Sequence, residues 1–368
     1  MKYLSEYRNF EATKSVLNKI EKEVSQTWNI MEVCGGQTHG LVKNGIIDLL
    51  PKKVRMIHGP GCPVCVTPVS LIDQAIKLLE EGVIVCSFGD MIRVPGSQKS
   101  LLQAKADGGD LRILYSPLEA VKIAADNPRK EVVFFAVGFE TTAPANALSV
   151  IQAKKLNLPN YSILVSHVLV PPAMEAILDD EFCNIDAFLG AGHVAAIMGY
   201  EDYFPLAEKY QIPIVITGFE PLDLVQGIHH AVKQLEKGIY KVENQYARAV
   251  KAEGNLEAKA VIEEVFGIGD REWRGIGTIP KSGYVIQPDY RAYDAAEKFG
   301  ISSIRVEEDP SCIAGDVLKG IKKPAACPEF GKRCTPASPL GAPMVSSEGA
   351  CAAYYHFNSS LHGNEINE

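Results

Sequence analysis

Two cysteines, Cys62 and Cys65, are separated by two residues within M-I-H-G-P-G-C-P-V-C-V-T-P, which runs from residue 56 to residue 68. Glycine permits backbone angles closed to other residues and proline fixes its own, so this stretch predicts a tight loop that holds two sulfur atoms in a set geometry. A helix is expected next, with Thr67 as its N-cap and Pro68 in its first position. Because both cysteines precede this cap, the helix dipole is expected to lower their pKa only weakly. Two thiols at this spacing can form a reversible disulfide, bind a metal or simply fill space.

A third cysteine, Cys34, follows a predicted strand and precedes the pair Gly35-Gly36. The two glycines let another backbone or a bulky ligand come near. A single exposed thiol in such a loop can serve as a nucleophile or as a metal ligand. His39, five residues later, could tune this thiol or pass protons, or it could be a helix-end histidine bonded to a carbonyl.

The last four cysteines lie in a segment rich in proline and glycine, with the spacing C-x14-C-x6-C-x16-C. They are Cys312, Cys327, Cys334 and Cys351. A segment this poor in apolar residues needs another source of order, and four thiolates favour an iron–sulfur cluster or a zinc ion over no metal at all. The absence of paired C-x-x-C knuckles favours the cluster, as does the Cys327-Pro328 pair. Glu348 could move protons near such a cluster or be a solvated surface charge.

The elements that must position these residues alternate between strand and helix, which predicts an α/β fold with parallel sheets. The predicted strands are 29–33, 54–57, 83–87, 112–115, 131–137, 162–166, 187–189 and 214–217. Function in such folds gathers beyond the carboxyl ends of the strands. The loops that carry Cys34, Cys62 and Cys65, Asp90, Glu140 and His193 all fall at such ends. Structural roles for the last three residues, as helix caps or loop staples, stay open.

The alternation of strands restarts near residue 131 and stops near residue 240, which suggests a division of the chain. We predict an N-terminal helix in residues 1–28, a first α/β unit in 29–130, a second in 131–240 and a C-terminal iron–sulfur domain in 241–368. Residues 241–266 have helical spacing, and the chain beyond residue 310 is expected to be irregular. One continuous sheet remains an alternative to two units.

Composition excludes several classes of protein. The 368 residues are 46% hydrophobic and 22% charged, which is an ordinary globular balance. A net charge of −8 argues against a nucleic-acid partner, and no apolar run is long enough to cross a membrane. The charged N-terminus is unlike a signal peptide, so we expect a cytoplasmic protein whose nine cysteines are not structural disulfides. Cys86 and Cys183 are expected to be small buried side chains.

Four motifs and the late cysteines together resemble the HypD family of [NiFe]-hydrogenase maturation proteins. The motifs are C-G-G-Q-T-H at 34–39, G-P-G-C-P-V-C at 59–65, S-F-G-D-M-I-R-V-P-G-S at 87–97 and G-F-E-T-T-A-P at 138–144. The resemblance runs essentially from end to end. The chain departs from the family at Ala191 and Ala195, where the family has a proline and a serine, and this weakens any role for His193.

The resemblance implies two Rossmann-like units and a mostly helical or irregular C-terminal domain that carries a [4Fe–4S] cluster on Cys312, Cys327, Cys334 and Cys351. It also implies a complex with the small protein HypC, joined by the cyanide donor HypE, in which an Fe(CN)2CO group is assembled. Cys34 matches the cysteine that binds this transient iron. Cys62 and Cys65 match a redox pair, and the sequence leaves open whether they also bind iron. Thiolate suits such a soft iron centre.

Other functions compete with this scaffold. A stand-alone thiol–disulfide oxidoreductase would use only Cys62 and Cys65, whereas a cysteine hydrolase would use Cys34 with His39 but lacks an evident third member. A nucleotide enzyme has no support, because neither G-x-x-x-x-G-K-S/T nor G-x-G-x-x-G occurs. The sequence leaves open whether the isolated chain is an enzyme.

Overall fold

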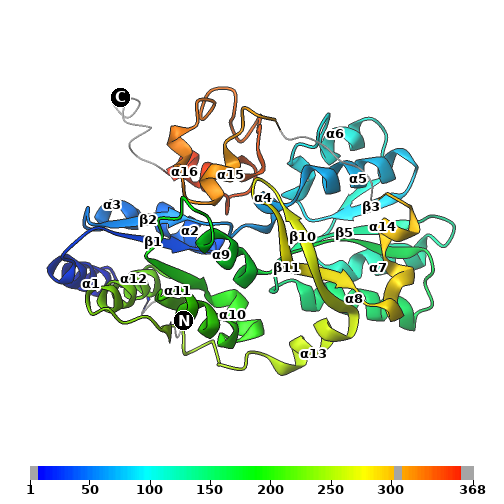
Figure 1. Cartoon of the computed structure of the whole chain (residues 1–368). Helices are drawn as coiled ribbons and strands as arrows, with labels where there is room; N and C mark the ends of the chain where they lie inside the picture. Colours follow the sequence, from blue (N-terminus) through cyan, green and yellow to red (C-terminus); the bar gives the residue numbers. More distant parts are fainter. Residues whose placement is uncertain (1–6, 302–308, 358–368) are drawn as a thin grey trace.

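The computed structural model describes residues 7–301 and 309–357. Parts of the predicted terminal domains, at 1–6, 302–308 and 358–368, lie outside the described residues. The chain has the predicted α/β fold with two parallel sheets, and each of the eight predicted strands overlaps an observed strand. Figure 1 shows the two sheets side by side, with the C-terminal segment above the gap between them.

The first sheet contains five parallel strands in the order β2-β1-β7-β8-β9. Their bounds are β1 Trp28–Glu32, β2 Val54–His58, β7 Ala187–Ala191, β8 Ile214–Thr217 and β9 Val242–Asn244. The second sheet contains four parallel strands in the order β4-β3-β5-β6. Their bounds are β3 Ile84–Ser87, β4 Leu111–Ile113, β5 Val132–Gly138 and β6 Tyr161–His167. Every residue of β5 and β6 is buried, as expected for strands covered on both faces.

The strands of the two sheets do not follow a division of the chain at residue 130. β1 pairs with β7 on one side and with β2 on the other, while β3 to β6 form the second sheet by themselves. The second sheet is therefore inserted between two parts of the first. Chain order could not reveal this, because parallel strands pair across long connections whose length does not fix the partner.

The helices cover both sheets, and several of them begin at a residue whose side chain caps the helix. The α-helices are α1 Phe10–Glu23, α2 Gly35–Lys43, α3 Ile46–Leu49, α4 Pro63–Val66, α5 Val69–Glu80, α6 Leu101–Ala106, α7 Pro117–Asp126, α8 Ala143–Lys155, α9 Val170–Leu178, α10 Gly192–Met198, α11 Phe204–Tyr210, α12 Pro221–Glu236, α13 Leu256–Val265, α14 Ala295–Lys298, α15 Ala314–Leu318 and α16 Ala350–Phe357. Helix α1, for example, starts at Asn9, whose side chain accepts a hydrogen bond from the amide of Ala12 at 3.0 Å. Its apolar side then packs on α12.

Residues 241–266 are not one helix, contrary to the expectation from their spacing. They contain β9, a loop and then α13, and a long antiparallel hairpin of β10 Phe266–Trp273 and β11 Gly277–Ile286 follows. The hairpin reaches the second sheet, where the amide of Leu169 donates to the carbonyl of Ser282 at 2.8 Å. The sequence hid these strands because glycines occupy several of their positions in place of the β-branched residues that mark a strand.

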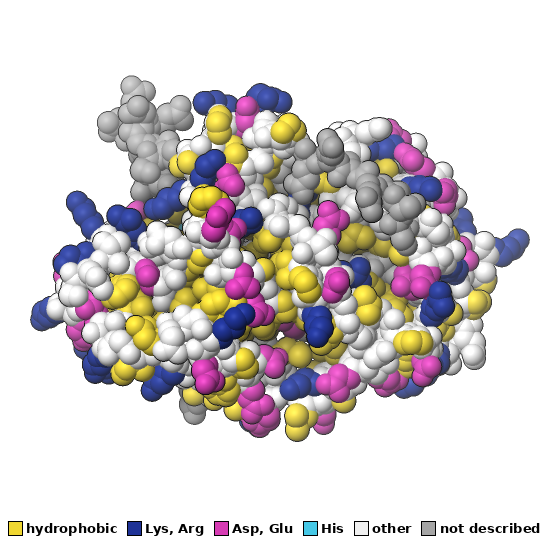
Figure 2. All heavy atoms as spheres, in the orientation of Figure 1, with side chains coloured by type: hydrophobic (Ala, Val, Ile, Leu, Met, Phe, Trp, Pro, Cys, Tyr) yellow, Lys and Arg dark blue, Asp and Glu magenta, His cyan; other side chains and the backbone are white. Residues whose placement is uncertain are grey.

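The C-terminal segment 309–357 is irregular, as predicted, with short helices that include α15 and α16. Helix α16 packs against α2 of the first unit, so this segment lies directly over the loop that starts α2. Figure 2 shows charged side chains of both signs spread over one face of the molecule, with apolar side chains between them. Among the described residues, no helix is both long and apolar enough to cross a membrane.

Candidate functional site

The loop of Cys34 and the loop of the cysteine pair are locked together by backbone contacts. Cys34 follows β1 and is the N-cap residue of α2, and the amide of Gly35 donates to the carbonyl of Gly61 at 2.8 Å. A Cβ on Gly61 would lie 2.6 Å from the carbonyl carbon of Cys34 and closer still to its nitrogen and Cα. Only glycine permits this close approach, which explains why residue 61, beside the cysteines, is a glycine.

Cys62 and Cys65 form a disulfide whose Cα atoms are 5.2 Å apart. They are 3% and 0% exposed and belong to the core cluster against which Cys34 packs. The helix expected after this loop is present as α5, but its N-cap is Pro68, one residue after the expected Thr67. A separate one-turn helix, α4, which the sequence did not indicate, precedes it; Cys62 caps α4, Pro63 takes its first position and Cys65 lies within it.

The side chain of Cys34 is half-buried. Burial raises its pKa to about 12, and the negative charges of Glu348 and Glu32 act in the same direction. Cys34 is therefore protonated in the isolated chain at neutral pH. A metal that bound to this thiol would have to displace the proton, so binding would release it.

A buried polar network that sequence reasoning missed joins the Cys34 loop to the C-terminal segment. Glu32, the last residue of β1, is completely buried and accepts hydrogen bonds from the amide of Cys34 at 3.0 Å, from Nδ1 of His58 at 2.7 Å and from the hydroxyl of Thr38. Nε2 of His58 lies 3.1 Å from the hydroxyl of Tyr354 in α16. Burial raises the pKa of Glu32, although its hydrogen bond with His58 opposes this.

The sequence signal that could have revealed this network is the position of Glu32 and His58 at the ends of their strands. Each residue closes an otherwise mostly apolar strand, and the register of β1 and β2 places them opposite one another. A carboxylate and an imidazole at the carboxyl ends of neighbouring parallel strands meet above the sheet.

His39 and Glu348 both lie where the C-terminal segment meets α2. Nδ1 of His39 lies 3.2 Å from the carbonyl oxygen of Ser347, and its ring packs edge-on against Phe357. No hydrogen bond joins His39 to Cys34 within residues 7–301 and 309–357. Glu348 lies against the Cys34 loop: a Cβ on Gly35 would be 2.5 Å from the Cβ of Glu348. Surrounding protein raises the pKa of Glu348, the charge of Asp90 adds to this and His39 opposes it.

Asp90 and Glu140 hold neighbouring loops. Asp90 accepts a hydrogen bond from the hydroxyl of Ser346 at 2.9 Å, so it ties the loop after β3 to the C-terminal segment. Glu140 is buried and accepts from the amide of Val170 at 2.9 Å through one oxygen, while its other oxygen has no partner among the described residues. Burial raises the pKa of Glu140 to about 7.

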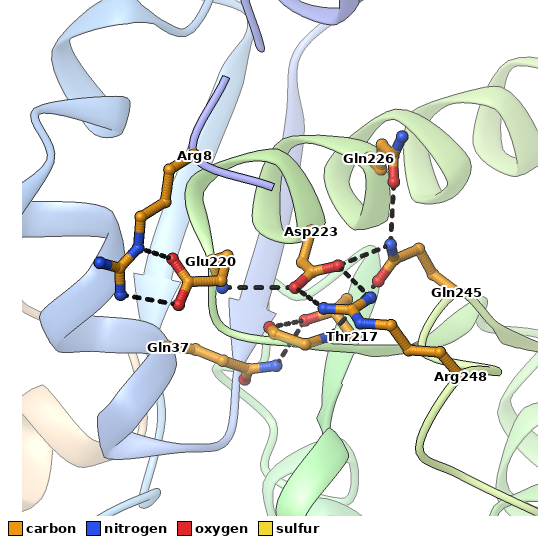
Figure 3. Close-up of polar contacts among 9 residues, drawn as sticks. Arg8, Gln37, Thr217, Glu220, Asp223, Gln226, Gln245 and Arg248 are labelled. Carbon is orange, nitrogen blue, oxygen red and sulfur yellow. Dashed lines mark hydrogen bonds and ion pairs between the residues drawn. The ribbon is translucent and has the colours of Figure 1, made fainter. Parts of the chain in front are cut away.

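Polar side chains near the carboxyl end of β8 hold the segment that follows this strand, as Figure 3 shows. Asp223 is buried and forms a two-point ion pair with Arg248, with contacts of 2.7 and 2.5 Å. Gln37 of α2 donates to the hydroxyl of Thr217 at 2.8 Å, and Arg8 pairs with Glu220 at 2.6 Å.

Between these anchors, Phe219 is held against the start of α2. Its ring would be 3.2 Å from a Cβ on Gly36, and it stacks on the ring of His193 with centroids 3.6 Å apart. His193 is therefore near the Cys34 loop, but it contributes a stacked ring there, and burial lowers its pKa. A groove of about 670 Å³ opens beside this point, lined by residues that include Gly36, His39, Phe219 and Leu49.

The four late cysteines line one small cavity in the C-terminal segment, together with apolar side chains that include Phe330 and Met344. Cys334 is buried, and Cys312, Cys327 and Cys351 are half-buried. Burial raises the pKa of Cys312 and Cys351, and for each of them the charges of the other late thiols act in the same direction. Gly341 leaves room for the sulfur of Cys312, which a Cβ would strike.

The chemistry of this lining would suit an iron–sulfur cluster. Within the described residues, no three His, Cys, Asp or Glu side chains converge closely enough to share one metal ion. The cluster's irons would each take one thiolate, so its ligands surround a volume instead of meeting at a point, and four cysteines around an apolar cavity have that arrangement.

Comparison with known proteins identifies the family. The HypD family, described as "Hydrogenase formation hypA family", matches residues 11–358. The chain is 47% identical to hydrogenase maturation factor HypD2 of Bradyrhizobium diazoefficiens, over 97% of both chains. It is 46% identical to HypD of Azotobacter vinelandii over 97% of both chains, and 45% identical to HypD of Escherichia coli over 97% of this chain and 98% of that one.

The chain belongs to the HypD family. The match covers the Cys34 loop, the disulfide loop and all four late cysteines, so the family resemblance and the assembled site concern the same residues. The relatives named above are hydrogenase maturation factors, and each matches this chain over nearly its full length. The expected family is confirmed.

Proposed function

We propose that this HypD-family chain is a redox-active scaffold on which the Fe(CN)2CO group of [NiFe]-hydrogenase is assembled in the cytoplasm. The iron is cargo: Cys34 binds it, together with a thiolate from the partner protein HypC. One observation carries the proposal, which is the locked contact between the Cys34 loop and the disulfide loop through Gly35 and Gly61. This contact keeps a metal-binding thiol beside a reducible sulfur pair.

The disulfide of Cys62 and Cys65 is the redox group of this site. On reduction it takes up two electrons and two protons and becomes two thiols, which can return the electrons when ligands are attached to the iron, or join Cys34 as ligands. Cys312, Cys327, Cys334 and Cys351 would hold a [4Fe–4S] cluster, which supplies electrons one at a time. Glu348 and His39, at the edge of the Cys34 loop, are placed to exchange protons with solvent.

The groove beside Cys34 suits the docking of HypC. Gly36 and His39, on the first turns of α2, form part of its wall, so a protein seated in the groove would contact residues next to Cys34. Exposed apolar side chains at its edge, Phe10 and Leu49, supply contact area. HypE, as the cyanide donor, joins through this complex.

A stand-alone thiol–disulfide oxidoreductase is less well supported. Cys62 and Cys65 are 3% and 0% exposed, so a disulfide of another protein has no access to them in this conformation. A cysteine hydrolase is also disfavoured, because His39 bonds to Ser347 of the C-terminal segment.

Infrared spectroscopy of the complex purified with HypC tests the proposal. We expect cyanide and carbonyl stretches in the complex of the native chain and their loss in Cys34→Ala, with the brown colour of the cluster retained. The matched control is Cys183→Ala, a half-buried cysteine outside the site, which should keep both signals. Retention of the stretches in Cys34→Ala would remove the assigned role of Cys34.

A further inference from the structure

The C-terminal segment carries a concentration of positive charge on an otherwise acidic chain. Residues 319–333 contain five cations and one carboxylate, although the whole chain has a net charge of −8. The cations are Lys319, Lys322, Lys323, Lys332 and Arg333. Dark blue side chains gather at the top edge of Figure 2, where Figure 1 places this segment.

Arg55 of β2 extends this charge onto the first sheet, and we call Arg55 and the five cations the basic face. Arg55, Lys322 and Lys323 line one hollow of about 180 Å³ between β2 and the C-terminal segment.

Carboxylates neutralise only part of the basic face. Ion pairs join Lys319 to Asp180 at 3.1 Å, Lys322 to Asp316 at 2.9 Å and Arg333 to Glu329 at 3.6 Å. Arg55, Lys323 and Lys332 form no ion pair with any residue in the part of the chain that the structure describes. Six cations against three carboxylates leave the face with a charge of +3.

The basic face lies next to the four-cysteine cavity, because Val317 lines both this cavity and the hollow of Arg55, Lys322 and Lys323. Cys327 lies in sequence between Lys323 and Lys332 and is half-buried. It lines the cavity together with the other three late cysteines. Apolar side chains are exposed within the same stretch: Ile321 is 44% exposed, and Pro328 is also exposed. A small apolar centre with a charged rim, over a half-exposed redox ligand, is the arrangement of a transient electron-transfer interface.

We propose that the basic face is the docking surface for a small acidic electron-carrier protein of the ferredoxin or flavodoxin class. This inference rests on the proposed function, since it supplies the electrons that the disulfide needs. Two reduced carriers each give up one electron and are oxidised, and the Cys62–Cys65 disulfide takes these two electrons and two protons from water to form two thiols.

Charge and position select this occupant. A protein of net charge −8 repels another acidic protein over much of its surface, so an acidic carrier is steered toward a region of opposite sign such as the basic face. HypC is assigned to a different surface, the groove between α1 and α2, which leaves the basic face open while the iron is being assembled.

The test measures binding of a purified acidic 2Fe–2S ferredoxin to the full chain by isothermal titration calorimetry. The double variant Lys323→Glu with Lys332→Glu reverses two unpaired charges, and we expect it to weaken binding about tenfold or more. Raising the salt from about 20 mM to about 200 mM should weaken the native interaction in the same direction. The matched control, Lys122→Glu with Lys237→Glu, makes the same charge change at exposed lysines on α7 and at the end of α12, and should lose much less affinity.

Equal loss in both double variants, or no binding by the native chain, would overturn the proposal. If charge reversal abolished binding of HypC instead of the carrier, the face would belong to the maturation partner and the proposal would also fall. Lys323→Gln with Lys332→Gln, which removes charge without adding any, gives the same answer should the reversed variant fold poorly. The infrared stretches of the HypC complex report separately on the proposed function. If these stretches are present but the carrier does not bind through the basic face, only this inference is refuted.

Discussion

The hydrogen-bond chain from Cys34 through Glu32 and His58 to Tyr354 makes a quantitative prediction. Tyr354→Phe removes one hydroxyl from α16 and keeps the ring, which packs edge-on against His58 with centroids 5.3 Å apart. The ring nitrogen of His58 then loses the partner that lies 3.1 Å away while it stays buried. Leaving a buried polar atom unsatisfied costs about 1–3 kcal/mol, and we expect a loss of free energy of unfolding in this range.

Glu32→Gln tests the other end of the same chain. Glu32 accepts from three donors, and a glutamine replaces one acceptor oxygen with a donor, so at least one of the three bonds is lost. The expected cost is again about 1–3 kcal/mol. Since His58 touches both residues, the two substitutions should not be additive, and we expect the double variant to lose less than the sum by about 0.5–2 kcal/mol.

Two measurements read out this cycle. Urea unfolding gives the free energies, and mass spectrometry gives the rate at which iodoacetamide alkylates Cys34, whose amide Glu32 holds at 3.0 Å. We expect alkylation to accelerate in both single variants. Tyr115→Phe is the matched control, because Tyr115 is 93% exposed and the same change there should alter neither quantity. Additivity within about 0.3–0.5 kcal/mol, with an unchanged alkylation rate in Tyr354→Phe, would refute the coupling of α16 to the Cys34 loop.

Three further predictions concern single positions. Gly61→Ala places a Cβ into the backbone of Cys34 and should cost about 1–3 kcal/mol or more in thermal unfolding, whereas Gly89→Ala, whose nearest contact would be 3.9 Å, should be tolerated. Burial raises the pKa of Glu140 from 4.5 to about 7, so its stabilisation is complete below about pH 4.5 and is lost as the pH rises through 7; the loss amounts to ~3 kcal/mol, and Glu140→Gln should abolish this pH dependence of unfolding. Cys351→Ser should remove the brown colour of the cluster from the purified chain, because it deletes one of four thiolates around the cavity, and a variant that stays brown would contradict the assigned ligand set.

The strands could be predicted from the sequence, but their grouping into sheets could not. Apolar runs such as residues 131–137 mark a buried strand whatever its neighbours are. The partner of β1 is a different matter: β7 starts at Ala187, and nothing in the composition of either strand records their pairing. The hairpin of β10 and β11 was missed for the opposite reason, since its pairing is local but its glycine-rich strands have weak strand propensity.

The cysteine loops could be predicted because residues that are adjacent in sequence indicate their chemistry. Cys62 and Cys65 stand among glycines and prolines, and such a loop has few uses other than holding the two sulfurs. The residues that connect the loops have no such signal in their neighbouring sequence. Glu32 and His58 are single polar residues 26 positions apart, and only the register of β1 against β2 makes them partners.

For the same reason, the contacts of the C-terminal segment could not be predicted from its own sequence. Tyr354 appears in a helix of small and aromatic residues as one more core side chain, yet its hydroxyl completes the chain that begins at the amide of Cys34. Glu348 likewise lies three residues before Cys351 in sequence, but its contact is with Gly35. Both residues face the first unit, so a change in how α16 sits on α2 is transmitted to the Cys34 loop by direct contact and by hydrogen bonds. The cavity of the four cysteines and the thiol of Cys34 are therefore parts of one packed structure, joined through α16.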